Sequence, residues 1–399
     1  MRTHIAWSAA LAVLTCSLWS TPPAHSENAP IIVGLAVAQT GWMTVVDADS
    51  SNSVRLWIAE RNAKGGLLGR QLKEITVDTK TDRAESARAG QAVVNQGADL
   101  VVVSCDYDEG SPAAAVAQRA GKISVFLCAG DPKAGVAGIG RFAFTAGIAS
   151  QLEGATIAEW AHKNLGVKKV YSLIDTGGEY SKSMCAGWDW AVKNNGMVSL
   201  GSDTFRNDDP SIQSQITRIT NLPEKPDAIM LCTFNPGGAS VIRQIRAAGL
   251  NMTLLAGASM DGTYWINAVP NLSNFYIDAH ASIWGDDPNA ELNGFPAKFN
   301  AKFGHPPANA FAIPIYVFMD LWAKAVEKAG TTDAAKVVAI MEQYKDEPTL
   351  IGPRSFTDKL HIQDHATLQI LKYEDGKPKD VGSYRIGEPV PYPVLFRMK

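Results

Sequence analysis

The sequence lacks the short motifs that mark several common classes of enzyme. It contains no G-x-S-x-G element of a serine hydrolase, no H-E-x-x-H of a zinc peptidase and no G-x-x-x-x-G-K phosphate-binding loop. No glycine fingerprint of a dinucleotide-binding protein follows the first expected strand. The sequence therefore offers no recognisable nucleophile or nucleotide-binding loop, and we expect neither an enzyme nor a cofactor.

The sequence also lacks a strong excess of either charge, and it has no long apolar run beyond its start. It carries 37 Lys and Arg residues against 40 Asp and Glu residues, for a formal net charge of -3. That balance favours neither nucleic acid nor an anionic membrane surface as a partner. No apolar run after residue 26 reaches the roughly 20 residues that a membrane-spanning helix needs. We therefore expect the main part of the chain to be soluble.

The first 26 residues have the pattern of a secretory signal peptide. Arg2 precedes an apolar run over residues 5–19, and the small residues Ala24 and Ser26 mark a suitable cleavage site. The run is too short to span a membrane. Cys16 offers an alternative, a lipid anchor, although its preceding threonine fits such a signal poorly. We expect a cleaved signal peptide over residues 1–26 and a periplasmic protein.

Cysteine is scarce, and four of the five cysteines follow the leader: Cys105, Cys128, Cys185 and Cys232. An even number in an exported protein favours disulfides, because that compartment is oxidising. Cys105 and Cys128 end two successive expected strands. Cys185 lies near the start of an expected helix, and Cys232 ends a strand in the same half. We expect Cys105 to pair with Cys128 and Cys185 with Cys232; the alternative is four small buried side chains.

Apolar runs typical of buried strands alternate with helical patterns from residue 29 onward. This alternation predicts parallel sheets with helices on both faces. It occurs twice in tandem, and the chain after the leader exceeds what one core usually serves, so we expect two lobes. The late segments must complete one or both lobes, and the repeated crossings make a hinge. The expected first lobe is residues 27–145 with 278–352, and the second is residues 146–277 with 353–399.

The expected elements follow this pattern through the chain. Strands are expected over residues 31–38, 72–78, 100–103, 123–128, 142–145, 169–174, 198–205, 227–234, 254–256 and 367–373. Helices are expected over residues 51–63, 84–95, 151–165, 211–222, 239–248, 289–303, 311–329 and 333–344.

The clearest unit of the pattern is residues 98–121. Residues 100–103 form an apolar run rich in β-branched side chains, typical of a central parallel strand covered on both faces. Ser111 followed by Pro112 predicts the N-cap and first turn of the next helix. In open α/β sheets small ligands bind at the carboxyl ends of the strands. We therefore expect the ligand near residues 105–109.

Aromatic or acidic side chains lie in every loop expected at a carboxyl end of a strand. Aromatic walls with a few fixed polar groups are what a small-molecule cleft requires. Purely structural roles stay open as alternatives, because the acids can be turn residues or helix caps and the aromatic side chains can belong to the core. The candidate ligand-binding residues are Trp42, Asp106, Tyr107, Asp131, Tyr180, Phe234 and Asp261, with Tyr264 and Trp265 beside the last.

Metal binding has weaker support. His361 and His365 flank Asp364, but zinc needs more ligands than the neighbouring sequence offers, so we expect surface histidines. Oxygen ligands from several loops could hold a calcium-like ion together with the ligand, yet no contiguous calcium-binding loop is present. We expect no metal site.

Several short segments occur in a characteristic order and spacing. They are Asn62-Ala63-Lys64-Gly65-Gly66-Leu67-Leu68-Gly69, Thr145-Ala146-Gly147, Glu179-Tyr180-Ser181, Gly237-Gly238 and Arg243-Gln244-Ile245-Arg246-Ala247-Ala248-Gly249-Leu250. Together they resemble the periplasmic branched-chain amino-acid-binding family, the type I solute receptors of ABC importers, over nearly all of the chain after the leader. The resemblance implies two doubly wound α/β lobes joined by three crossings and a ligand held in the cleft between them. It also implies a monomer with a membrane permease as its partner.

The sequence departs from this family where the ligand is expected. Amino-acid-binding members offer small hydroxyl residues and helix amides to a ligand carboxylate, where this sequence has Asp106 and Tyr107. The next loop, usually Ala-Thr, carries Asp131, and the glutamate that commonly grips the ligand ammonium has Ser259 or Asp261 as its nearest counterpart. Because Asp106 would repel a carboxylate, a plain α-amino acid is disfavoured. A cationic amine, a polyol or another hydroxyl-rich ligand fits better.

These observations predict a receptor that encloses a small polar ligand between its lobes, whether amino-acid-like, an amine or a polyol. Closure would be a population shift driven by contacts to both lobes, and an importer would recognise the closed form. A sensory receptor of the same fold that reports to a membrane kinase is an alternative. A secreted hydrolase is the alternative from another class, and it would need a carboxyl with a raised pKa near a second carboxyl.

Overall fold

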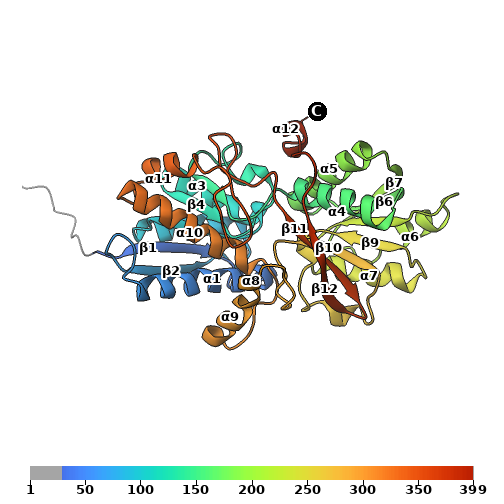
Figure 1. Ribbon diagram of the computed structural model, residues 1–399, viewed down its shortest axis with the longest axis horizontal. Helices are drawn as coiled ribbons and strands as arrows, with labels where there is room; N and C mark the ends of the chain where they lie inside the picture. Colours follow the sequence, from blue (N-terminus) through green and yellow to red (C-terminus); the bar gives the residue numbers. More distant parts are fainter. Residues whose placement is uncertain (1–28, 399) are drawn as a thin grey trace, which may run out of the picture.

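The protein folds into two α/β lobes that lie side by side along its longest axis (Figure 1). The computed structural model describes residues 29–398, so the expected leader and Cys16 lie outside the described part. Within residues 29–398, no helix combines the length and the apolar character that crossing a membrane requires. Each lobe has a sheet between layers of helices, as the alternating sequence pattern predicts.

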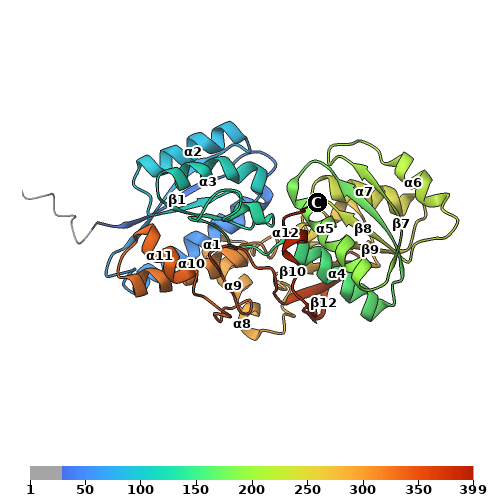
Figure 2. The same cartoon turned by 90° about the horizontal axis from the view of Figure 1, so that it is seen from above.

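The first lobe is built on a sheet of five parallel strands. Its elements are β1 (Ile31–Val37), α1 (Thr44–Ala63), β2 (Leu72–Asp78), α2 (Arg83–Asn95), β3 (Leu100–Val103), α3 (Tyr107–Arg119), β4 (Ile123–Phe126), η1 (Pro132–Ala134), β5 (Ala143–Thr145), α8 (Ala290–Asn293), α9 (Phe295–Phe303), α10 (Ala312–Ala329) and α11 (Ala334–Met341). The strand order is β2-β1-β3-β4-β5. Helices α2 and α3 cover one face, and α1, α10 and α11 cover the other (Figure 2). Strands β3 and β4 are buried along their whole length, which explains their continuous apolar runs.

The second lobe repeats this plan with a sheet of seven strands. Its elements are α4 (Ser150–Leu165), β6 (Lys169–Asp175), α5 (Glu179–Asn194), β7 (Val198–Phe205), α6 (Gln213–Thr220), β8 (Ala228–Cys232), α7 (Gly237–Ala247), β9 (Thr253–Ala256), η2 (Ala258–Met260), η3 (Ile266–Ala268), β10 (Phe275–Ala279), β11 (Leu368–Glu374), β12 (Lys377–Tyr384) and α12 (Tyr392–Leu395). The order is β12-β11-β10-β9-β8-β6-β7; the pairs β10–β11 and β11–β12 are antiparallel, and the other pairs are parallel. Helices α4 and α5 cover one face, whereas α6 and α7 cover the other.

The chain passes between the lobes three times: after β5, after β10 and before β11. The first and third crossings lie side by side. The backbone N–H groups of Thr145 and Ala149 donate to the carbonyl oxygens of His361 and Gln363, at 3.2 and 2.8 Å. This arrangement of two sheets and three connections is the hinge that the resemblance implies.

The lobe boundaries that we expect fall close to these crossings. Residue 278 lies inside β10, which belongs to the second sheet, so the chain leaves that sheet a residue or so later. Phe356 lies just beyond residue 352 and still packs in the first core, with its ring centroid 5.2 Å from that of Phe144.

The start of α3 differs from the prediction. The helix begins at Tyr107, and Asp106 is its N-cap: the Asp106 side chain accepts hydrogen bonds from the N–H groups of Asp108 and Glu109, at 2.7 and 3.3 Å. The two acids of the first turn also suit the positive end of the helix dipole. The expected start at Ser111 is wrong because the earlier aspartate caps the helix, which leaves the proline that follows Ser111 inside it.

Helix α1 also begins earlier than expected, at Thr44 instead of residue 51. Buried Asp47 lies in this added part and fixes the ends of two strands. Its carboxylate accepts hydrogen bonds from the N–H groups of Ala38 and Cys105, at 2.8 and 2.9 Å. Residues 44–50 do not show a helix pattern, because two valines stand among polar residues and both aspartates of the segment are buried instead of facing the solvent.

The expectation of surface histidines is wrong for His361. Its side chain is fully buried, its ring stacks on Phe144 with centroids 3.8 Å apart, and its Nδ1 atom lies 2.9 Å from the carbonyl oxygen of Ala143. The third crossing runs over the core of the first lobe at this point, so the ring is covered. The region around His361 is irregular in structure.

Both expected disulfides are present. The Cys105–Cys128 pair has Cα atoms 4.5 Å apart, and the Cys185–Cys232 pair has Cα atoms 5.7 Å apart. The first bridge ties together the loops that follow β3 and β4. The second attaches α5 to the end of β8.

Candidate functional site

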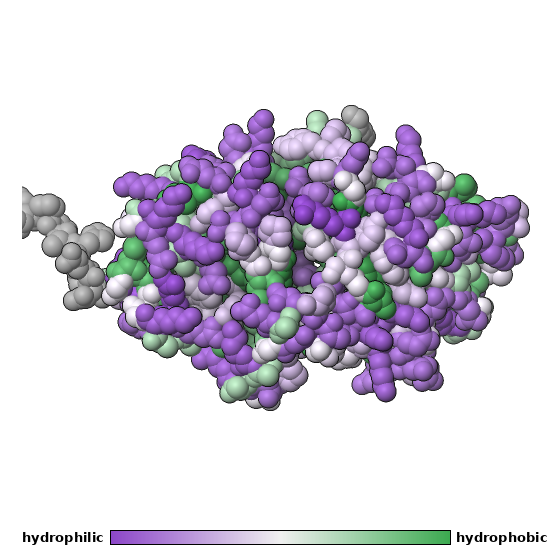
Figure 3. Space-filling model, viewed as in Figure 1, coloured by the Kyte–Doolittle hydropathy of each residue, from purple (hydrophilic) through white to green (hydrophobic). Residues whose placement is uncertain are grey.

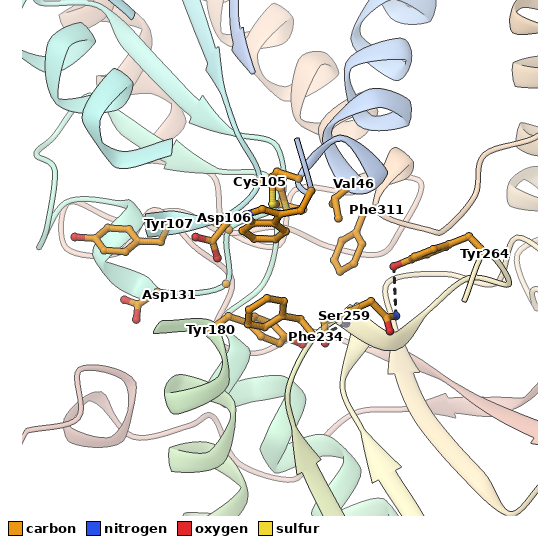
Figure 4. A pocket seen from close by; sticks show the side chains of 16 residues that line it. Val46, Cys105, Asp106, Tyr107, Asp131, Tyr180, Phe234, Ser259, Tyr264 and Phe311 are labelled. Carbon is orange, nitrogen blue, oxygen red and sulfur yellow. Dashed lines mark hydrogen bonds between the residues drawn. A yellow bond between two sulfur atoms is a disulfide. The ribbon is translucent and has the colours of Figure 1, made fainter. Parts of the chain in front are cut away.

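A pocket that is partly open to solvent lies between the lobes at the carboxyl ends of strands from both sheets (Figure 4). The outer surfaces of the lobes are mainly hydrophilic in Figure 3, and apolar residues gather near the middle of the molecule. The first lobe contributes Trp42, Met43, Val46, Cys105, Asp106, Tyr107, Cys128, Ala129, Gly130, Asp131 and Phe311. The second lobe contributes Tyr180, Phe234, Asn235, Ser259 and Tyr264.

The parallel sheets explain why these residues meet. Asp106 follows β3 and Asp131 follows β4, and the two strands are neighbours in the sheet. The disulfide between Cys105 and Cys128 holds the two loops together, and both cysteines line the pocket. Six of the seven candidate ligand-binding residues therefore come together here, and Asp261 is the exception.

Asp106 is both a helix cap and a pocket residue. Its Oδ1 atom accepts the two amide hydrogen bonds at the start of α3. Among residues 29–398, no hydrogen bond engages its Oδ2 atom. Burial, together with the charges of Asp108 and Glu109, raises the pKa of Asp106 to about 7, although the amide hydrogen bonds act in the opposite direction. The cleft thus holds a carboxyl group with one free oxygen and a strong preference for a positive neighbour.

Asp131 caps the short helix η1 and also joins the two lobes. Its Oδ1 atom accepts a hydrogen bond from the N–H of Lys133 at 2.8 Å. Its Oδ2 atom accepts one from the Ser183 hydroxyl of α5, also at 2.8 Å, and lies 3.3 Å from Nη2 of Arg397. The side chain is almost completely buried. Its contacts make Asp131 a link between lobes beside the cleft.

Aromatic rings form much of the remaining wall. The rings of Trp42 and Phe234 stack across the cleft with centroids 5.7 Å apart. Figure 4 shows Phe311 on the first-lobe side and Tyr180 and Phe234 on the opposite side. The ring of Tyr107 points away from the others, because it stacks on Phe126 of β4 with centroids 6.4 Å apart. Tyr107 thus lines the pocket close to its backbone, not with the ring that we expected to face the ligand.

Tyr180 rests on buried carboxyl groups of the second lobe. Its hydroxyl donates to Oε2 of Glu153 at 2.5 Å and accepts from the N–H of Ser259 at 3.3 Å. Burial raises the pKa of Glu153 to about 7. Burial and the Glu153 charge also raise the pKa of Asp278 on β10. Because two adjacent buried carboxylates repel each other, this pair retains a proton near neutral pH.

Asp261 has a structural environment away from the pocket lining. Its Oδ2 atom accepts a hydrogen bond from the N–H of Ala310, and its Oδ1 atom accepts one from its neighbour Gly262, both at 2.7 Å. Burial raises the pKa of Asp261 to about 6. The carboxylate thereby ties the loop after β9 to the segment that leads into α10. Of the two aromatic neighbours, Tyr264 lines the pocket, whereas Trp265 packs in the core against Phe275 and Tyr373.

The sequence did not single out several residues that line the pocket. Asn235 belongs to the turn after β8 and could have been found from that position. Met43 is the N-cap of α1, and Val46 belongs to the added first turn of that helix. Phe311 comes from the start of α10, about 200 residues from the β3 loop, and no local pattern predicts its place. Within residues 29–398, no three His, Cys, Asp or Glu side chains gather in a way that could hold a metal ion.

Ion pairs join the lobes at the rim of the cleft. Nζ of Lys133 lies 2.6 Å from Oε2 of Glu179, and Arg397 also pairs with Glu179. The N–H of Glu179 donates to Oδ2 of Asp108 at 3.0 Å, so α5 contacts the first turn of α3. The lobes are thus in direct contact across the cleft. A ligand between them would be enclosed from both sides.

Two α/β lobes, three connecting segments and a small-molecule cleft between the strand ends define a two-lobed solute-binding protein. The chain belongs to the periplasmic binding protein family, because the model of the family described as "Periplasmic binding protein" matches residues 30–377. The resemblance inferred from the sequence is confirmed.

Named relatives and solved structures agree with this assignment. The Leu/Ile/Val-binding protein BraC3 of Rhizobium johnstonii is 24% identical over 369 residues, which cover 92% of this chain and 97% of the relative. The branched-chain amino acid transporter substrate binding protein LivJ of Streptococcus pneumoniae, solved with isoleucine, superposes with a TM-score of 0.77 at 21% identity over 90% of this chain and 99% of LivJ. A solute binding protein of an ABC transporter from Rhodopseudomonas palustris, solved with 3,4-dihydroxybenzoic acid, superposes with a TM-score of 0.74 at 19% identity. The match covers 90% of this chain and 98% of that protein.

Proposed function

We propose that the protein is the extracytoplasmic solute-binding receptor of an ABC importer. It captures a small polar ligand between its lobes and presents the closed form to a membrane permease. The observation that carries this proposal is the cleft itself, whose walls come from both lobes and meet where Trp42 stacks on Phe234. A ligand that contacts both walls stabilises the closed form, because only that form makes both sets of contacts.

The proposal includes the compartment. The leader pattern of residues 1–26 and the two disulfides both fit an oxidising space outside the cytoplasm. BraC3 is named for binding Leu, Ile and Val, LivJ is a transporter's substrate binding protein, and the Rhodopseudomonas palustris protein belongs to an ABC transporter. We propose that this chain works in the periplasm as a monomer, with a permease of an ABC importer as its partner.

A binding role fits the cleft better than a hydrolytic one. The pKa of Asp106 is raised, as a general acid requires, but a second carboxylate must be free to act with it. Asp108 accepts a hydrogen bond from the N–H of Glu179 and pairs with Arg83, and Asp131 is held by Ser183 and Lys133. Both neighbouring acids are therefore committed to structural contacts. We propose that the protein is not an enzyme.

Thermal unfolding of residues 27–399 tests the receptor function. The panel contains amino acids, amines, polyols, sugars and aromatic acids. A solute at about 100 times its Kd adds roughly 2.7 kcal/mol to the native state, which raises Tm by a few degrees. We expect one chemical class to do so in the wild type and in Val45→Ala, an exposed neighbour outside the pocket, but far less in Trp42→Ala. If no class of solute raises Tm, or if the bound solute is converted to a product, the proposal is wrong.

A further inference from the structure

We infer that the cleft selects an organic cation with an apolar body, such as an alkylated ammonium ion. The inference rests on the proposed receptor function and names the class of ligand for that same cleft. Three features carry it: the charges that line the cleft, the hydrogen-bonding groups left free in it, and its aromatic walls.

Of the two acids that line the cleft, Asp106 has no basic partner among the described residues. Asp131 is already paired with Arg397 at 3.3 Å, and no Lys, Arg or His is among the described residues that line the pocket. Lys133, two residues after Asp131, pairs with Glu179 and has its ammonium 5.9 Å from the centroid of the Tyr107 ring, which points away from the cleft. A ligand carboxylate would therefore enter beside acids without a basic side chain to receive it. Such an arrangement disfavours anions.

The helix amides that could hold an anion are already occupied. A free helix N-terminus attracts carboxylates through its N–H groups and dipole. In this protein, Oδ1 of Asp106 accepts the N–H groups of Asp108 and Glu109 at the start of α3. The helix supplies its own anion as the cap. This end of the cleft therefore attracts a cation and not an anion, because it presents the free Oδ2 atom of Asp106 to the ligand.

Two hydroxyl donors of the cleft are also committed, whereas the Tyr264 hydroxyl accepts from Nδ2 of Asn235 at 3.4 Å and keeps its own proton. The Ser259 hydroxyl donates to the carbonyl oxygen of Thr233 at 2.7 Å, and the Tyr180 hydroxyl donates to Glu153. Asn235 is buried and lines the pocket, and its Oδ1 atom has no hydrogen-bond partner within the described residues. The free acceptors are therefore Oδ2 of Asp106, which carries the charge, and Oδ1 of Asn235, beside the single free hydroxyl donor of Tyr264 among the described lining residues. A polyol needs both kinds of partner, whereas an ammonium ion needs acceptors.

The aromatic rings of the cleft also favour a cation with an apolar body. Trp42, Phe234, Tyr180, Tyr264 and Phe311 line the cleft with Asp106 on its first-lobe side. Ring faces attract cations, most strongly when water is excluded, and they bury the apolar body of the ligand at the same time. A strongly hydrated inorganic ion would gain little from these walls. The geometry therefore favours a compact organic monocation.

Isothermal titration of residues 27–399 with five probes tests the inference. The probes are choline, n-butylammonium, leucine, benzoate and glycerol. We expect choline or n-butylammonium to bind at least 10-fold tighter than the other three. We expect Asp106→Asn to weaken that binding at least 10-fold, since asparagine still caps a helix but carries no charge. The matched control is Asp82→Asn, which changes the N-cap of α2 in the same lobe in the same way and should leave the Kd within 2-fold.

The outcomes separate the ligand class from the receptor function. Tighter binding of leucine, benzoate or glycerol overturns the cation inference but leaves the receptor function standing. Cation binding that survives Asp106→Asn unchanged overturns the role of this carboxylate, and with it the inference. Absence of binding by both cations at 10 mM overturns the inference as well. The receptor function itself fails if the wider panel of solutes also leaves Tm unchanged, or if a bound solute is converted to a product.

Discussion

The indole ring of Trp42 and the phenyl ring of Phe234 stack across the cleft with centroids 5.7 Å apart and planes inclined by 28°. Trp42 belongs to the loop after β1 in the first lobe, and Phe234 to the loop after β8 in the second. Their contact requires the lobes to be close. Trp42 is also 43% exposed, so it can rearrange around a ligand without disturbing a core.

Replacement of Trp42 should weaken binding more than folding. Aromatic contacts with a desolvated cation or an apolar body contribute about 1–2 kcal/mol, so Trp42→Ala should raise the Kd about 10-fold. The half-exposed ring leaves the free energy of unfolding within about 0.5 kcal/mol of the wild type. Titration calorimetry and urea unfolding measure the two quantities. Val45→Ala is the control, and an equal loss of affinity in that variant would speak against a specific role for the indole.

Glu179 should control how readily the lobes close. Burial raises the pKa of Glu179, but the hydrogen bonds from Lys133, Arg397 and Lys182 outweigh it and hold the pKa well below its usual value. Glu179→Gln removes the charge that joins Lys133 of the first lobe to α5 of the second. We expect a larger radius of gyration in X-ray scattering of the ligand-free protein.

The matched control for that variant is Glu224→Gln. Glu224 pairs with Lys169 on the outer surface of the second lobe, at 2.9 Å, and makes no contact between lobes. Its radius of gyration should equal that of the wild type. An unchanged radius in Glu179→Gln as well would mean that the rim ion pair has no part in closure.

Removal of the two disulfides should affect ligand binding differently. Each closes a loop, of 23 or 47 residues, and the chain-entropy model gives about 3–4 kcal/mol of stabilisation for such loops. The Cys185→Ala/Cys232→Ala variant should lose stability but keep its Kd, because neither side chain lines the cleft. The Cys105→Ala/Cys128→Ala variant should lose both stability and affinity, since the missing bridge fixes the Asp106 and Asp131 loops in the wild type. Equal Kd values in both variants would contradict this assignment of roles.

Glu153 should make the stability depend on pH. Its pKa of about 7 in the folded state lies above the usual value near 4.5, so between these values the folded protein binds more protons than the unfolded chain. The free energy of unfolding therefore falls as pH rises from about 4.5 to 7, by at most roughly 1.4 kcal/mol per pH unit from this group. Glu153→Gln should flatten that slope in urea unfolding, whereas Glu224→Gln should not. An unchanged slope in Glu153→Gln would contradict the burial of a protonated carboxyl beneath Tyr180.

Much of the fold could be predicted from the repeated alternation of strands and helices. The expected strands at residues 72–78, 100–103 and 198–205 coincide with strands of the structure, although only 100–103 is an apolar run buried on both faces and the other two are edge strands. Strand β12 could not be predicted, since its polar, largely exposed residues show no apolar alternation. It exists because the chain reverses at Asp375 and Gly376, both with positive φ, and pairs back on β11.

The site was predictable in position but not in detail. Strand ends of parallel sheets place their loops together, so Asp106 and Asp131 could be identified from their order in the chain. Their second role as caps depends on where each helix begins, which the Ser111 signal misplaced by several residues. The direction of a side chain depends on packing: Phe126 turns the ring of Tyr107 away, and the N–H of Ala310 draws Asp261 out of the pocket lining.

Energy transfer between dyes on the two lobes measures closure of the cleft directly. The four cysteines in residues 27–399 are paired in disulfides, so Lys64→Cys at the end of α1 and Val198→Cys at the start of β7 provide exposed sites for specific labelling. We expect two distance populations without ligand. Saturation with the solute that raises Tm most should leave the shorter one, and Glu179→Gln should favour the longer. A distance distribution that the bound solute leaves unchanged would contradict closure of the cleft as the working step of this protein.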